Sequence, residues 1–226
     1  MQLPLFERYI DQLIEQSTLD IPVWNIEKAR AGKAGGWNYI DGCMILALLE
    51  TYRATGEKRY FEFADAFIDH RVKEDGTING YSVEEYNIDN VNAGKTLFAL
   101  YEINGKEKYR KAIDLIYSQV QSQPRTAEGN FWHKKIYPNQ VWLDGLYMGQ
   151  PFYMEYETRF NGRKNYGDIF AQFAAVVKHM RDEKTGLYYH GYDASREVFW
   201  CDRETGLSKN FWLRALCRNP SRTPFN

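Results

Sequence analysis

Residues 41–70 decide the fold, and they read DGCMILALLETYRATGEKRYFEFADAFIDH. The same pattern starts again at Asp89 and at Asp144, so the acidic residues lie 48 and 55 positions apart. Each copy has an acidic residue, a helical run, a turn with Gly and a basic residue, a Tyr, and a second helical run. A period of about 50 residues with two helices per unit is typical of helical hairpins that stack on one another. The sequence therefore predicts an all-α fold.

Apolar residues recur with the helical period inside the repeats, as Phe61, Ala64 and Ile68 do. The predicted helices cover about residues 2–16, 41–54, 57–72, 91–103, 106–121, 144–160 and 165–181. Residues 19–39 resemble a loop, because Pro22 and a Gly pair interrupt them. The long Gly-, Asp- and Asn-rich segments 73–90, 122–143 and 182–210 separate the hairpins. Because connections within a hairpin are short, we expect these long loops to form one functional face.

The bulk composition is that of a globular protein with one sizeable core. The 226 residues carry a net charge of −1, which argues against nucleic acid and an anionic membrane as partners. No run approaches the roughly 18 apolar residues of a membrane span, and the N-terminus does not resemble a signal peptide, so we expect a cytoplasmic protein. The three cysteines include no CxxC pair, so neither a zinc site nor a disulfide framework is indicated.

Aromatic residues are abundant, with 17 Tyr, 13 Phe and 6 Trp, and many lie beside Gly, Asp and Asn. Aromatic faces next to polar groups suit sugar ligands, but Tyr and Trp also fill core and rim positions between helices.

The acidic residues of the repeats also have two interpretations. Asp is a favoured helix cap, and for Asp41 capping is favoured over catalysis. Asp144 lies between Trp142 and Tyr147, an aromatic setting of the kind that keeps a carboxyl group protonated near neutrality.

The segments YNIDNVNAGKTLFAL, NQVWLDGLYMGQPFYMEYE, GLYYHGYDASREVFW and DRETGLSKNFWLRA closely resemble glycoside hydrolase family 105, the unsaturated rhamnogalacturonyl hydrolases. The unsaturated glucuronyl hydrolases of family 88 are more distant relatives. The resemblance covers residues 1 to about 215. It implies an (α/α)6-barrel, a six-hairpin toroid with its site at the end that carries the long loops.

The resemblance also implies the site. Asp144 matches the catalytic acid/base, and Asp89 matches a partner carboxylate that contacts the sugar. The matched substrate-binding residues are His133, His190, Trp142, Trp212 and Arg214. Without the resemblance, a lone His is more often structural than functional. No metal and no organic cofactor is needed, and the implied ligand is an unsaturated uronyl oligosaccharide.

The implied reaction removes the terminal Δ4,5-unsaturated galacturonyl residue from rhamnogalacturonan lyase products. Asp144 would protonate C4 of the double bond and then activate a water that attacks C5, so one group acts as acid and then as base. Three alternatives stay open: an unsaturated glucuronyl hydrolase that acts on other lyase products, an inactive truncated fragment, and a helical-repeat binding scaffold.

The chain departs from the family at its C-terminal end. A full ring has twelve helices, whereas about seven are predicted here, so we expect an incomplete barrel over residues 1–217. Pro220 and Pro224 interrupt the last residues, and 218–226 is predicted to be an aberrant non-helical tail, from a frameshift or truncation. A short homologue that completes its ring through another chain is the alternative. An incomplete barrel exposes apolar surface, which predicts self-association.

Overall fold

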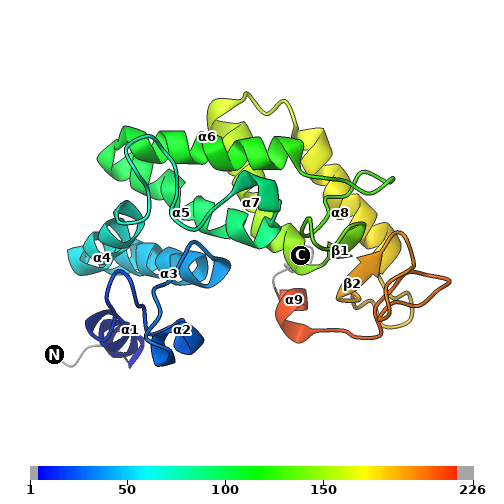
Figure 1. Ribbon diagram of the computed structural model, residues 1–226, viewed down its shortest axis with the longest axis horizontal. Helices are drawn as coiled ribbons and strands as arrows, with labels where there is room; N and C mark the ends of the chain where they lie inside the picture. Colours follow the sequence, from blue (N-terminus) through cyan, green and yellow to red (C-terminus); the bar gives the residue numbers. More distant parts are fainter. Residues whose placement is uncertain (1–4, 218–226) are drawn as a thin grey trace. The chain divides into compact units, whose positions relative to one another are not determined.

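The computed structural model describes residues 5–217, and this part of the chain consists mainly of α-helices (Figure 1). The chain forms two compact units. The first comprises Met1–Tyr81 and Ala93–Leu115, and the second comprises Ser82–Asn92 and Ile116–Asn226. The tail predicted at 218–226 lies outside the described residues.

The described residues contain nine α-helices, one short 3-10 helix and two strands. The helices are α1 (Leu5–Glu15), α2 (Ile26–Arg30), α3 (Tyr39–Thr55), α4 (Lys58–Asp69), α5 (Ile88–Asn104), α6 (Glu107–Ser122), α7 (Asp144–Phe160), α8 (Tyr166–Met180) and α9 (Leu213–Cys217), with η1 at Val83–Glu85. All seven predicted helices are present, and the ends that fall within residues 5–217 lie within three residues of the predicted ones. The predicted start of the first helix, at residue 2, lies outside the described residues. The prediction of a loop at 19–39 was wrong where α2 forms, because a five-residue helix is too short to show a period.

In the first unit, α3 and α4 form the first hairpin of the repeat. Gly56 ends α3 in the left-handed region (φ 74°), and its N–H donates to the Tyr52 carbonyl at 2.8 Å. Glycine adopts this conformation without strain, which explains the Gly in the turn. The buried residues of α3 and α4 that fill the core are Ile45, Leu48, Leu49, Tyr60, Ala64, Phe67 and Ile68.

Asp41 does not cap α3. The cap is Asn38, whose side-chain oxygen accepts from the Asp41 backbone N–H at 3.0 Å. The buried Asp41 carboxylate accepts from Trp24 Nε1 and Asn38 Nδ2, both at 2.8 Å. Burial raises the pKa of Asp41, and these hydrogen bonds offset only part of the effect. The capping interpretation of Asp41 was therefore wrong, and within its unit Asp41 holds the N-terminal loop to α3.

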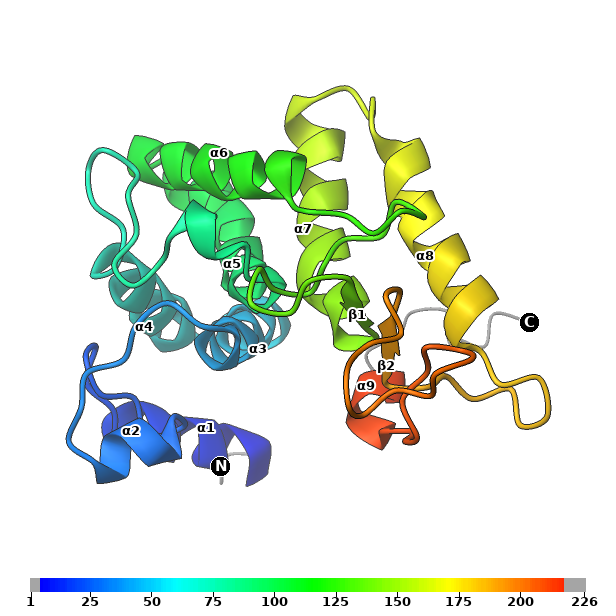
Figure 2. The ribbon, with the colours of Figure 1, turned by 45° about the vertical axis from the view of Figure 1, so that its right-hand side comes forward.

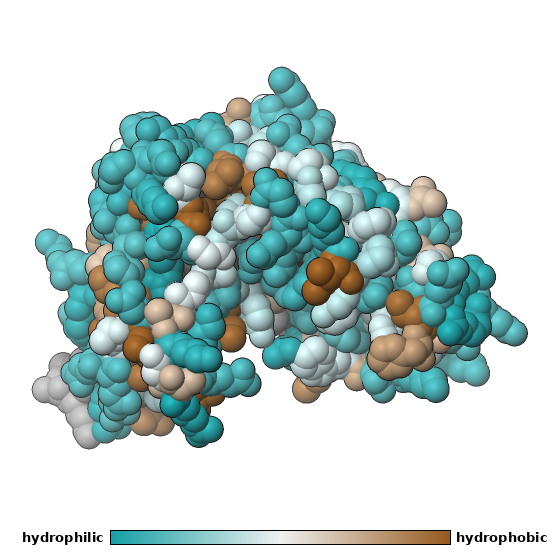
Figure 3. Space-filling model, in the orientation of Figure 1, coloured by the Kyte–Doolittle hydropathy of each residue, from teal (hydrophilic) through white to brown (hydrophobic). Residues whose placement is uncertain are grey.

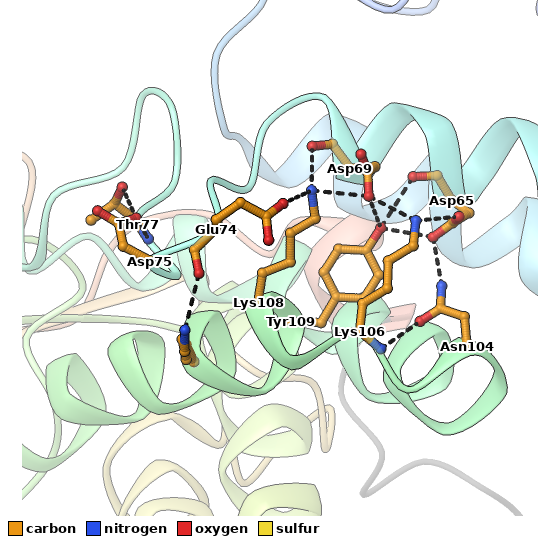
Figure 4. Close-up of polar contacts among 10 residues, drawn as sticks. Asp65, Asp69, Glu74, Asp75, Thr77, Asn104, Lys106, Lys108 and Tyr109 are labelled. Carbon is orange, nitrogen blue, oxygen red and sulfur yellow. Dashed lines mark hydrogen bonds and ion pairs between the residues drawn. The ribbon is translucent and has the colours of Figure 1, made fainter.

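The repeated Tyr is a structural residue in the second copy (Figure 4). The Tyr109 hydroxyl donates to an Asp65 carboxylate oxygen of α4 at 2.7 Å. Lys106 forms ion pairs with Asp65 at 2.8 Å and with Asp69 at 2.7 Å, and Lys108 lies 3.0 Å from Asp69. These contacts join α4 to the first turn of α6, which explains why the repeat turn combines basic residues with a Tyr.

In the second unit, α7 and α8 form the third hairpin, and the strands β1 (Gln140–Trp142) and β2 (Gly191–Asp193) lie near the start of α7 and the end of α8 (Figure 2). The strands pair antiparallel, with Val141 opposite Tyr192. The sequence predicted loops here, because three-residue strands carry no readable alternation. A buried apolar cluster lies between this ribbon, α7, α8 and α9, and consists of Val141, Leu143, Leu146, Val176, Met180, Tyr188, Tyr192, Ala215 and Leu216.

The surface is mainly polar on the face seen in Figure 3, where hydrophobic residues occur in small groups. Among the exposed apolar side chains of the described residues are Leu5, Phe6 and Tyr9 of α1 and Phe199, which is 94% exposed. Self-association through exposed apolar surface stays a prediction. Every helix within residues 5–217 is too short or too polar to cross a bilayer.

Candidate active site

The start of α5 packs beside two glycines of α7. A Cβ atom at Gly149 would lie 3.4 Å from Ile88 Cγ2, and one at Gly145 would lie 3.9 Å from the same atom. The Ile88 backbone N–H also donates to the His133 carbonyl at 3.0 Å. Ile88 thus packs against α7, and the next residue, Asp89, lies beside His133.

Asp89 is a partly buried carboxylate, with 15% of its side chain exposed, and it has two basic neighbours. His133 Nε2 lies 3.1 Å from Oδ1, and Lys134 Nζ lies 2.8 Å from Oδ2. Burial opposes ionisation, but the hydrogen bonds and charges of His133 and Lys134 outweigh it and hold the pKa of Asp89 well below its usual range. The Asp89 side chain therefore stays an anion at any working pH.

His133 is held by contacts of its ring and of its backbone. It is 3% exposed, and its ring stacks on Trp142 with centroids 4.9 Å apart and planes at 8°. Trp142 in turn stacks on Tyr137 at 5.4 Å and 7°. The His133 backbone N–H donates to the Gln140 carbonyl at 2.8 Å, which ties the histidine to β1. These contacts leave Nε2 directed at Asp89.

Asp144 is the first residue of α7 and is buried. The preceding residue, Leu143, donates its backbone N–H to the His190 carbonyl at 2.9 Å, which places β2 beside the helix start. Asp144 also acts on the His190 ring: burial lowers the pKa of His190, the negative charge of Asp144 opposes this, and His133 and Arg214 add to the lowering.

Trp212 and Arg214 complete the cluster. Trp212 meets the His190 ring edge-on, with centroids 4.7 Å apart, and the Arg214 guanidinium lies 3.8 Å from the Trp212 ring centroid. The Trp142 ring also contacts the His190 ring, with centroids 5.5 Å apart. The geometry thus connects all of the residues that the sequence singled out, namely Asp89, His133, Trp142, Asp144, His190, Trp212 and Arg214.

Sequence reasoning did not single out Lys134 or Tyr137. Lys134 follows His133 in the segment NFWHK, and its ion pair with Asp89 makes it part of the site. Its position next to a matched histidine was the signal that could have found it. Tyr137 extends the stack of rings behind Trp142, and no local pattern marks it.

A cavity of about 320 Å³ opens beside the cluster. Trp142 and His190 form one part of its wall, and Phe199, Trp200 and Lys209 line another. Cavities of roughly 300 Å³ and more hold small organic ligands, and aromatic walls with a few polar groups suit sugar rings. Within residues 5–217 no group of three or more His, Cys, Asp or Glu side chains is arranged to hold a metal ion.

The lowered pKa of His190 predicts a pH-dependent stability. The unfolded chain takes up a proton at His190 below pH of about 6.5, whereas the folded chain resists protonation. This part of the stability is present above that pH and is lost as the pH falls through the folded pKa. His190→Gln removes the titration. We therefore expect its urea midpoint to fall less than that of the unmodified protein between about pH 7 and pH 5. Equal losses in the two proteins would contradict the expectation.

The chain is similar in sequence and fold to known proteins. The model of Glycosyl Hydrolase Family 88 matches residues 9–217. A solved glycoside hydrolase of family 105 from C. acetobutylicum ATCC 824 is 42% identical, with a TM-score of 0.83 over 94% of this chain and 56% of that enzyme. A possible member of family 105 from Klebsiella pneumoniae is 18% identical, with a TM-score of 0.69 over 89% of this chain and 55% of that one, and shows the fold alone.

Among curated proteins, Protein Atu3128 of Agrobacterium fabrum is 38% identical over 69 residues, which are 30% of this chain and 29% of that protein. The chain thus spans less than two thirds of these relatives. The likeness to solved structures confirms the predicted all-α class of the α/α-barrel type. Since the family model covers nearly the whole chain, the protein belongs to the group described by the model of Glycosyl Hydrolase Family 88, and it is similar to the solved glycoside hydrolase of family 105.

Proposed function

We propose that this site removes the terminal Δ4,5-unsaturated galacturonyl residue from rhamnogalacturonan lyase products by hydration of the C4=C5 double bond. The observation that carries the proposal is the connected cluster of Asp89, His133, Asp144 and His190 in a chain of this family. The chain covers 56% of the solved family 105 enzyme, and the activity is proposed for the site that these residues build.

The proposed reaction adds water across the double bond. Asp144, in its acid form, gives a proton to C4, and positive charge develops at C5 and the ring oxygen. The resulting Asp144 carboxylate takes a proton from a water whose oxygen bonds to C5. The product is a hemiketal, which opens and releases the neighbouring sugar. One group thus serves as acid and base, so the separation of two carboxylates does not predict the stereochemical outcome here.

Asp89 supplies the fixed negative charge of this scheme. Its lowered pKa keeps it ionised, and a preorganised anion stabilises positive charge that develops on the sugar ring. Its partners His133 and Lys134 hold it in place. Arg214 is proposed to bind the uronate carboxylate, because its planar guanidinium can form a bidentate pair. Trp142 and Trp212 are proposed as walls that contact the C–H faces of the sugar.

The test follows the ultraviolet absorbance of the conjugated uronate. The protein is incubated with rhamnogalacturonan digested by a lyase and, in parallel, with a glycosaminoglycan digested by a lyase that leaves unsaturated glucuronate. Loss of absorbance with release of the neighbouring sugar from the first substrate is the expected result. A faster loss of absorbance on the glycosaminoglycan digest would mean that unsaturated glucuronate, and not unsaturated galacturonate, is the substrate. This second candidate is favoured by the match to the family 88 model. No loss on either would overturn the activity of this chain.

The remaining sequence predictions accompany this proposal. An oligosaccharide is the proposed ligand, and neither a nucleic acid nor a membrane is proposed as a partner. A cytoplasmic location and self-association stay predictions.

A further inference from the structure

A second cavity, of about 20 Å³, lies behind the His133 ring. Its walls come from the start of α5, from the segment before β1, and from α7, through residues that include Ile88, His133, Gly145 and Gln150. A cavity of this volume holds one water molecule, provided that polar groups face it.

Two buried polar atoms on residues that line this cavity have no protein partner. They are His133 Nδ1 and Gln150 Oε1, and each residue is 3% exposed. A carboxylate only accepts hydrogen bonds, so the 3.1 Å contact with Asp89 places the hydrogen of His133 on Nε2. In the neutral ring Nδ1 is then an acceptor, as Gln150 Oε1 is. Two acceptors cannot satisfy each other, and leaving both unpaired in a buried place is unfavourable.

Two other polar side chains beside the cavity, Gln172 and Trp142, already have partners. Gln172 accepts from the Phe131 backbone N–H at 2.9 Å and donates to the Gly129 carbonyl at 2.9 Å. Trp142 Nε1 donates to Gln140 at 3.2 Å. Gly145 leaves the space open, because a Cβ atom there would lie 3.2 Å from His133 Nδ1.

We propose that one water molecule occupies this cavity and donates one hydrogen to His133 Nδ1 and the other to Gln150 Oε1. Gln150 is then a positioning residue: through the water it fixes the tautomer and orientation of His133, and His133 holds Asp89. A water satisfies both acceptors at once, and when His133 takes up a proton the same water can accept from Nδ1 and still donate to Gln150. The water site stands on the geometry alone, and its effect on catalysis rests on the proposed function.

The first test is the state of His133 by long-range proton–nitrogen NMR, which is tractable because the chain has four histidines. The expected spectrum of the unmodified protein has the proton of neutral His133 on Nε2. Gln150→Met removes the acceptor at similar side-chain length, and we expect it to shift the Nδ1 resonance of His133. Gln150→Glu places an acid beside the ring, and we expect it to put a proton on Nδ1 as well.

The control is Leu146→Val, which alters an apolar part of the same wall and should leave the His133 resonances in place. A neutral His133 ring that carries its proton on Nδ1 in the unmodified protein, or a His133 spectrum that neither Gln150 variant changes, would overturn the proposal. If one Gln150 variant does not fold, the other still gives the decisive spectrum. A crystal structure that shows Gln150 in direct contact with His133 and no water between them would also overturn it.

The second test is kinetic. We expect Gln150→Met to lower kcat on the lyase product by about tenfold with little change in KM, since a small displacement of catalytic groups costs rate more than binding. An unchanged kcat would overturn the positioning role. If the unmodified protein does not act on lyase products but the His133 spectrum changes as expected, the proposed function fails while the water site stands.

Discussion

Asp144→Asn is expected to lower the rate of unsaturated uronate removal by about a thousandfold, with KM nearly unchanged. The amide has the size of the carboxyl group but can neither give a proton to C4 nor take one from water. Because Asp144 is buried at the start of α7, the isosteric change keeps the packing around it. The measurement is the initial loss of ultraviolet absorbance from lyase-digested rhamnogalacturonan.

The control for this variant is Glu155→Gln, which lies on the same helix. Glu155 is partly exposed and pairs with Arg159, so its substitution should leave the rate unchanged. If Asp144→Asn keeps more than about a tenth of the activity, Asp144 is not the general acid of this reaction. The role of general acid would then belong to another group of the cluster.

Glu157→Leu is expected to have the largest effect on stability, a loss on the order of 3 kcal/mol. Glu157 is fully buried. It accepts from the Tyr117 hydroxyl at 2.6 Å, from Asn161 at 2.9 Å, and from the Asn165 backbone at 2.9 Å. Leucine leaves these donors without an acceptor between the end of α6 and the α7–α8 hairpin. The midpoint of urea unfolding measures the loss.

The same network fixes the pH range of this effect. Burial raises the pKa of Glu157, but the hydrogen bonds from Tyr117 and its two asparagine neighbours outweigh it and lower the pKa. Its contribution is therefore present above the unfolded value of about 4.3 and is lost as the pH falls through the folded pKa. Glu155→Leu, two residues away on the surface, should cost less than about 1 kcal/mol. Equal losses for the two variants would show that the network does not stabilise the unit.

The helices could be predicted because their signal is local. Apolar residues such as Phe67 and Ile68 recur with the helical period whatever they pack against, and Gly56 marks the turn by its left-handed backbone. The strands β1 and β2 could not be predicted in this way. Each has three residues, and they exist because Val141 and Tyr192, far apart in the chain, pair across one ribbon.

The same distinction applies to the candidate site, where some residues could be predicted from the sequence and others could not. The segments around Asp89, His133, Asp144 and His190 could be recognised because each carries a distinctive string of residues. Lys134 and Gln150 could not be singled out, since their importance depends on which atoms they meet: a carboxylate at 2.8 Å for Lys134, and a small cavity for Gln150. Asp41 was misread as a cap because Asn38, three residues earlier, is also a favoured cap residue, and only its extended backbone shows that the helix begins there.

The sequence by itself determined the helical hairpins, the family resemblance and the residues that should meet in the site. Only the tertiary structure decided that Asp89 is ionised between His133 and Lys134 and that Trp142 and His190 share one wall with Asp144 nearby. The physical reason is the separation along the chain over which each effect acts. Periodicity and turn conformation act over a few residues, whereas burial, charge and hydrogen bonding depend on groups that the fold brings together from distant parts of the chain.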